Sequence, residues 1–115
     1  MSTTRGRAYI DRRIELLVAG KTDQMVDDGY EDDAVLISFD GQFKGKAALK
    51  EYFGRHIPDL GGLKLKSVDK LTETKDAIFV QLTVTTGKYG DVTSYEAFVL
   101  RGGEGKAEYH FTALK

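Results

Sequence analysis

The chain has 115 residues, of which 41% are hydrophobic and 30% are charged, and its formal net charge is −1. This balance is typical of a globular protein, so we expect residues 1–115 to form a single domain. The small net charge does not favour a nucleic acid partner, because DNA- and RNA-binding proteins usually carry a basic excess. Apolar runs are far shorter than the roughly 18 residues that cross a bilayer, and the N-terminus lacks the apolar stretch of a signal peptide. We therefore expect a cytoplasmic protein with no membrane partner.

Few reactive residue types are available to this chain. It contains no cysteine and only two histidines, His56 and His110. Disulfides, thiolate metal sites and cysteine nucleophiles are thereby excluded, and a metal site built from several histidines is not expected. The glycine-rich stretch 102–105 precedes a predicted strand, whereas a phosphate-binding loop precedes a helix. We expect neither a metal nor an organic cofactor.

The first half of the sequence predicts three helices and one short hairpin. Apolar residues at helical spacing, closed by a glycine or proline, indicate helices over roughly residues 7–19, 22–29 and 45–58. Residues 33–39 are apolar and β-branched enough for a strand, and the Asp-Gly pair at 40–41 predicts a turn into a short strand at 42–44.

From residue 63 onward the pattern becomes one of long strands. The predicted strands are roughly 63–74, 77–87, 92–101 and 106–114, with turns at 75–76, 88–91 and 102–105. Long strands joined by short turns predict an antiparallel meander. With most helices preceding most strands, the architecture is α+β.

The order of these elements resembles the nuclear transport factor 2-like superfamily, which includes ketosteroid isomerases and SnoaL-type polyketide cyclases. Segments with local resemblance are residues 19–23, 30–35, 45–53 and 105–106, so the likeness spans nearly the whole chain. The resemblance implies a cystatin-like cone, in which three N-terminal helices pack on a strongly curved antiparallel sheet around a cavity for a small apolar molecule. It also implies a homodimer formed through the outer face of the sheet.

Alternation along the last three strands divides their residues into two sets. The apolar set is Ile78, Val80, Leu82, Val84, Tyr95, Ala97, Val99, Tyr109, Phe111 and Ala113. The polar set is Gln81, Thr83, Thr85, Ser94, Glu96, Glu108, His110 and Thr112. Polarity alone predicts that the apolar set packs on the helices and the polar set faces water or a dimer partner. The resemblance implies instead that polar residues face the cavity, and both interpretations stay open.

Two polar residues are candidates for proton transfer. Aligned on Gly105-Lys106, His110 falls where SnoaL-like proteins often carry an inward histidine, and Glu96 falls near an inward carboxyl that serves ketosteroid isomerases as an oxyanion donor. The two residues are predicted on neighbouring strands. Glu96 would then orient His110 and raise its pKa, forming a catalytic pair.

Some positions differ from the catalytic residues of ketosteroid isomerases, and others are expected to bind substrate. Ser38 lies near the place of the catalytic aspartate of ketosteroid isomerases, and a serine hydroxyl does not take a proton from a carbon acid at neutral pH. The tyrosine of their first helix has no clear counterpart, because Arg13 falls there and Tyr9 lies one turn earlier. True ketosteroid isomerase activity is therefore disfavoured. The residues expected to bind substrate are Tyr30, Ser38, Tyr52, Phe53, Gln81, Thr83, Phe98 and Thr112.

Two functional hypotheses follow. The first is a cofactor-independent isomerase, cyclase or dehydratase that moves a proton on a small apolar carbonyl or polycyclic compound, with His110 as acid/base and Glu96 as its partner. The second is a non-catalytic ligand-binding or dimerisation module of the same fold.

Overall fold

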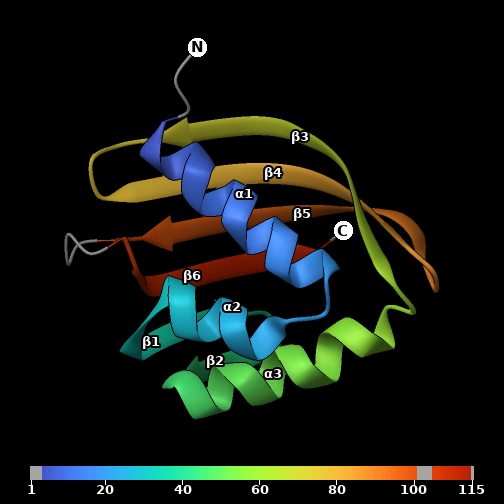
Figure 1. Ribbon diagram of the computed structural model, residues 1–115, viewed down its shortest axis with the longest axis horizontal. Coiled ribbons are helices and arrows are strands. Elements are labelled where there is room, and N and C mark those ends of the chain that lie inside the picture. Colours follow the sequence, from blue (N-terminus) through green and yellow to red (C-terminus); the bar gives the residue numbers. More distant parts are fainter. Residues whose placement is uncertain (1–3, 101–104, 115) are drawn as a thin grey trace.

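The computed structural model describes residues 4–100 and 105–114, and places three helices against a six-stranded sheet within them (Figure 1). The elements are α1 (Arg5–Val18), α2 (Thr22–Gly29), β1 (Tyr30–Ser38), β2 (Gly41–Lys44), α3 (Lys46–Asp59), β3 (Leu63–Glu73), β4 (Ala77–Thr86), β5 (Gly90–Val99) and β6 (Ala107–Leu114). Most of the turn expected at 102–105 lies outside the described residues. No helix in the described ranges is long and apolar enough to cross a membrane.

The sheet has the strand order β2-β1-β6-β5-β4-β3. Strands β3 to β6 form the predicted antiparallel meander, but β1 pairs with β6 in parallel, so the sheet is mixed. Strand β6 runs antiparallel to β5 and in the same direction as β1. Register shifts in β3 mark bulges, which bend a strand, and Figure 1 shows β3 and β4 curving past the end of α1.

Helix α1 lies across the inner face of this curved sheet (Figure 1). Its buried positions are Gly6, Ile10, Arg13 and Leu16, spaced as one helical face. The apolar members pack in a core with Ile78, Val80 and Phe98 of the sheet. Burying each large apolar side chain contributes roughly 1.5–3 kcal/mol, so this face holds α1 in place. Arg13 is the one charged residue on it.

Each prediction for the two faces of the sheet is correct for only some of the strands. The pairing register sets Val80 opposite Glu96 and Phe98 opposite His110, and residues opposite one another share a face. The inner face therefore combines the apolar residues of β4 with polar residues of β5 and β6. Their counterparts, including Phe79 of β4, point to the outer face.

Candidate functional site

A cavity of about 380 Å³ lies between α1, α3 and the inner face of the sheet. This volume falls in the range of roughly 300–1,000 Å³ that holds small molecules. Its wall is mainly apolar and includes Ile14, Leu17, Phe53, Ile57, Leu82 and Val84. The buried polar residues Arg13, Ser94 and Glu96 also line it and form its floor, whereas the exposed residues Phe39, Asp40 and Tyr89 form its rim.

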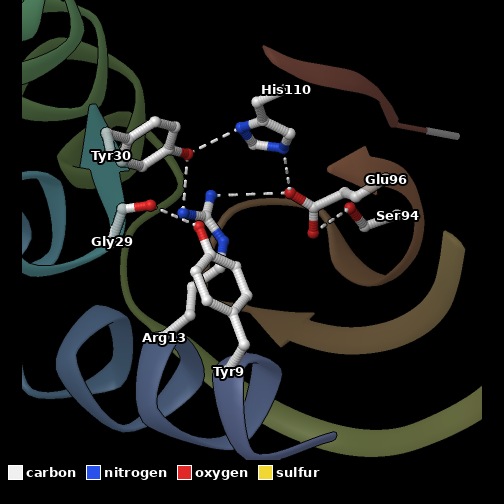
Figure 2. Close-up of polar contacts among 7 residues, drawn as sticks. All are labelled: Tyr9, Arg13, Gly29, Tyr30, Ser94, Glu96 and His110. Carbon is white, nitrogen blue, oxygen red and sulfur yellow. Dashed lines mark hydrogen bonds and ion pairs between the residues drawn. The ribbon is translucent and has the colours of Figure 1, made fainter. Parts of the chain in front are cut away.

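Four buried polar side chains, each from a different element, contact one another at the floor of the cavity and directly behind it (Figure 2). Arg13 Nη1 lies 2.8 Å from Tyr30 Oη, which lies 2.7 Å from His110 Nδ1. On its other side, His110 Nε2 lies 2.8 Å from Glu96 Oε1. Arg13 Nη2 closes the ring at 3.5 Å from the same carboxylate oxygen. We call these four residues the buried polar cluster.

The hydrogen positions in the buried polar cluster follow from chemistry. A guanidinium only donates, so Tyr30 Oη accepts from Arg13 and directs its own hydrogen to His110 Nδ1. That nitrogen is therefore unprotonated. The proton of the neutral ring sits on Nε2, from which it is donated to Glu96.

The ionisation states agree with this arrangement. Burial and the nearby Arg13 charge outweigh Glu96 and lower the pKa of His110 to about 4. Glu96 does raise this pKa, as expected, but burial and the Arg13 guanidinium lower it by more, so the net shift is downward. Burial opposes ionisation of Glu96, but the His110 hydrogen bond, the Arg13 charge and the Ser94 hydroxyl together lower its pKa to about 2. At neutral pH Glu96 is thus a carboxylate and His110 is uncharged.

Aromatic rings hold the cluster in position. The ring of Phe98 stacks on that of His110, with centroids 4.2 Å apart and planes 18° from parallel. The Arg13 guanidinium lies 5.2 Å from the ring centre of Phe53 and 5.1 Å from that of Phe98, within the range of a cation–π contact. The charge of Arg13 is therefore balanced by one carboxylate and by aromatic faces.

Only part of the cluster is available to a ligand. Glu96 and Arg13 line the cavity, and the Ser94 hydroxyl donates to Glu96 Oε2 at 3.1 Å. His110 and Tyr30 are fully buried and do not line it. The sequence had assigned the acid/base role to His110, but the geometry presents Glu96 to the cavity and keeps His110 behind it.

The remaining expected site residues divide into three groups. Ser38, Tyr52, Phe53 and Thr112 line the cavity. Phe98 lies behind it against His110. Gln81 and Thr83 do not reach the site, because their side chains lie on the opposite face of β4 from the cavity-lining residues Leu82 and Val84. There Thr83 donates a hydrogen bond to Asp69 at 2.6 Å.

Sequence reasoning missed Arg13 and Ser94 as site residues. A signal for Arg13 was present, since it lies three residues after Ile10 and three before Leu16, inside the buried stripe of α1. A buried arginine normally requires a buried partner. Ser94 carried no comparable signal, because a serine on a strand is more often exposed.

The rim carries a second histidine. The His56 ring stacks on Tyr52 with centroids 4.2 Å apart, and its Nδ1 lies 2.8 Å from the Tyr52 carbonyl oxygen. Its Nε2 lies 3.8 Å from Asp40 on the turn between β1 and β2. In the described ranges, no group of three or more acidic, histidine or cysteine side chains is placed to hold a metal ion.

Comparison with known proteins rests on the fold alone, because no family model and no curated protein matches the sequence. A SnoaL-like protein of unknown function from Burkholderia thailandensis is similar over 100% of this chain and 98% of its own, with a TM-score of 0.81 and 13% identity. A protein described as NTF2-like, from Anabaena variabilis, matches 100% of this chain and 95% of its own, with a TM-score of 0.78 and 17% identity. The chain has the nuclear transport factor 2-like fold.

A candidate isomerase of the SnoaL-like family from Agrobacterium tumefaciens has the same fold, with a TM-score of 0.80 over 98% of this chain and 99% of its own at 8% identity. The nuclear transport factor 2-like fold hosts many chemistries, so activity has to be argued from the cavity and its residues.

Replacing Tyr30 by phenylalanine is expected to raise the pKa of His110. The Tyr30 hydroxyl can donate to Nδ1 only while that nitrogen is unprotonated, so it stabilises the neutral ring. The measurement is an NMR titration of the His110 ring. Tyr9→Phe is the matched control, because the Tyr9 hydroxyl donates to the Gly29 carbonyl at 2.7 Å. An unchanged midpoint in Tyr30→Phe, or an equal shift in both variants, would contradict the assigned hydrogen positions.

Proposed function

We propose that this protein binds one small, largely apolar molecule in the cavity, with the polar end of that molecule against Glu96 and Arg13. The observation that carries the proposal is the ionised Glu96 at the floor of an otherwise apolar cavity. Removing a charged pair from water costs several kcal/mol per ion before any compensation, and apolar side chains of similar size are often as stable. Stability alone therefore does not favour an ion pair at this position, whereas recognition of a polar group does.

The test is binding of 2-naphthylmethanol, a neutral probe with an apolar body, followed by isothermal titration calorimetry. We expect saturable binding of one molecule per chain. Val84→Trp fills the cavity and should weaken binding at least tenfold. Thr83→Trp adds the same ring to the adjacent residue on the opposite face of β4 and should leave the affinity unchanged. Absence of saturable binding, or an equal loss in both variants, would overturn the proposal.

The pairing of Glu96 with Arg13 favours a second function, cofactor-independent proton transfer on a small apolar carbonyl compound. Glu96 would accept the proton of a C–H bond next to the carbonyl, the electron pair of that bond would form a C=C bond, and the π pair of the carbonyl would move to its oxygen. Arg13 would stabilise the resulting enolate oxygen, and Glu96 would return the proton. His110 would hold Glu96 in position without touching the substrate.

The low basicity of Glu96 favours ligand binding over proton transfer as the function of the cavity. A pKa of about 2 makes Glu96 a weaker base than an ordinary glutamate by roughly 3 kcal/mol of proton affinity, and binding does not need that strength. Deuterium exchange at the α-carbons of 2-tetralone, followed by NMR, tests the catalytic function. Exchange faster than in buffer that is abolished by Glu96→Gln would support it. Exchange at the buffer rate would exclude it for this ketone.

The outer face of the sheet favours self-association. A row of apolar side chains crosses four strands there. Phe79 pairs with Ala97, Ala97 pairs with Phe111, and Phe111 pairs with Ile37. In this row Phe79 is 58% exposed, Phe111 is 42% exposed and Ile37 is 36% exposed. We propose that a second copy of the chain covers this row, since a contiguous apolar patch commonly marks an interface.

Replacing Phe79 by aspartate should weaken this self-association at least tenfold in sedimentation velocity, because the charge would lie in the middle of the interface. Phe39→Asp is the control. Phe39 is 96% exposed, but it lies on the turn after β1 and lines the rim of the cavity. A wild-type chain that stays monomeric at high micromolar concentration would exclude the dimer.

A further inference from the structure

We infer that the ligand of this cavity presents a single neutral hydroxyl group to the floor, and that the cavity discriminates against both carboxylates and ammonium groups. The inference deepens the proposed binding function and rests on it. It follows from the number of hydrogen-bonding positions left open at the floor and from the two opposite charges that line it.

The carboxylate of Glu96 has one acceptor position left. Each carboxylate oxygen accepts about two hydrogen bonds. Oε1 receives the His110 Nε2 hydrogen at 2.8 Å and the Arg13 Nη2 hydrogen at 3.5 Å. Oε2 receives the Ser94 hydroxyl hydrogen at 3.1 Å. One position on Oε2 remains for a ligand, so Glu96 can accept one donated hydrogen.

The neighbouring strand supplies a hydroxyl group to the same cavity. Thr112 pairs directly with Glu96 across β5 and β6, and both residues line the cavity. The Thr112 hydroxyl makes no hydrogen bond to any other residue that the structure describes. One acceptor next to one donor matches a hydroxyl group, which donates one hydrogen and accepts another. A ketone oxygen uses only the donor, and an ammonium group brings three hydrogens to one acceptor.

Charge excludes the ionised alternatives. Glu96 and Arg13 both line the floor and are in contact, so a ligand charge of either sign meets a like charge there. A carboxylate would lie against Glu96, and Asp40 and Asp59 at the rim add to the repulsion. An ammonium group is attracted by these carboxylates, but it also lies near Arg13, which stays protonated in proteins, and it brings three hydrogens to the one open position of Glu96. A neutral polar group avoids both costs, and apolar residues surround the rest of the ligand.

A matched series of probes tests the inference at pH 7. The series is 2-naphthylmethanol, 2-naphthylmethylamine, 2-naphthoate and 2-methylnaphthalene, which share the ring system and differ in the polar group. We expect the alcohol to bind at least tenfold more tightly than the amine and the carboxylate, and several-fold more tightly than the hydrocarbon. A carboxylate or amine that binds as tightly as the alcohol would overturn the inference while leaving the cavity as a binding site. If no probe binds, the proposed function itself fails.

Two variants locate the selectivity at the floor. Thr112→Val keeps the shape of the side chain and removes its donor, so the alcohol should lose several-fold in affinity and 2-methylnaphthalene should lose none. Thr83→Val is the control on the outer face and should change neither. Glu96→Gln should reduce the ratio of alcohol to carboxylate affinity at least fivefold. An unchanged ratio in Glu96→Gln, or no loss in Thr112→Val, would contradict the assigned contacts.

Discussion

Replacing Arg13 by methionine is expected to lower the free energy of unfolding by about 3–5 kcal/mol, because removal of one partner leaves a buried charge uncompensated. Arg13 is the cation that faces Glu96, and it also donates to Tyr30 at 2.8 Å. Methionine fits the same space without donors. Urea unfolding at pH 7, followed by circular dichroism, measures the change.

Arg12→Met provides the matched control on the same helix. The Arg12 side chain is 50% exposed and forms surface ion pairs with Glu15 at 3.2 Å and Asp28 at 3.5 Å. Exposed pairs of this kind contribute about 0–1 kcal/mol. Equal losses in the two variants would mean that Arg13 does not compensate a buried carboxylate. In the double variant Arg13→Met/Glu96→Gln, the loss should be smaller than the sum of the single losses, since no unpaired carboxylate remains.

The second large effect is on the pH dependence of stability. The pKa of His110 lies at about 4 in the folded chain, below the 6.5 of an exposed histidine. Between these values the unfolded chain binds one more proton than the folded chain, so stability falls as the pH is lowered through this window. The loss from His110 alone is about 3 kcal/mol. Glu96 acts in the same direction at lower pH, because its pKa is lowered from 4.5 to about 2.

Urea unfolding at pH 7, 5.5 and 4 tests this prediction. His110→Gln keeps a donor near Glu96 but does not titrate, so its stability should change much less between pH 7 and pH 4 than that of the wild type. His56→Gln, at the rim of the cavity, should keep the wild-type dependence. A wild-type stability that stays level from pH 7 to pH 4 would show that His110 is not held neutral by burial and by Arg13.

Part of the site could be predicted from local signals and from the order of the elements. Helical spacing and the glycine and proline stops placed α1, α2 and α3, since these signals act within a few residues. Alternation placed Glu96 and His110 in the polar set of the last three predicted strands. The resemblance of the element order to the nuclear transport factor 2-like superfamily then indicated a cavity on the side of the helices.

The assignment of faces could not be predicted in the same way. Alternation shows which residues of one strand share a face, but it does not relate one strand to the next. That relation depends on register, and a shift of one residue exchanges the two faces of a strand. The sequence therefore suggested that Gln81 lies on the same face as Glu96, whereas pairing sets Val80 opposite Glu96 and turns Gln81 outward.

The amino-acid sequence by itself determined the elements, their order and the α+β class, because turns, caps and periodicity are properties of neighbouring residues. Only the tertiary structure decided the chemistry of the site. Arg13 and His110 are 97 positions apart in the sequence, yet packing of α1 on β5 and β6 brings both to Glu96. Removal of water from that contact sets the charge of each group, and burial of this kind exists only once the helix and the strands have packed together.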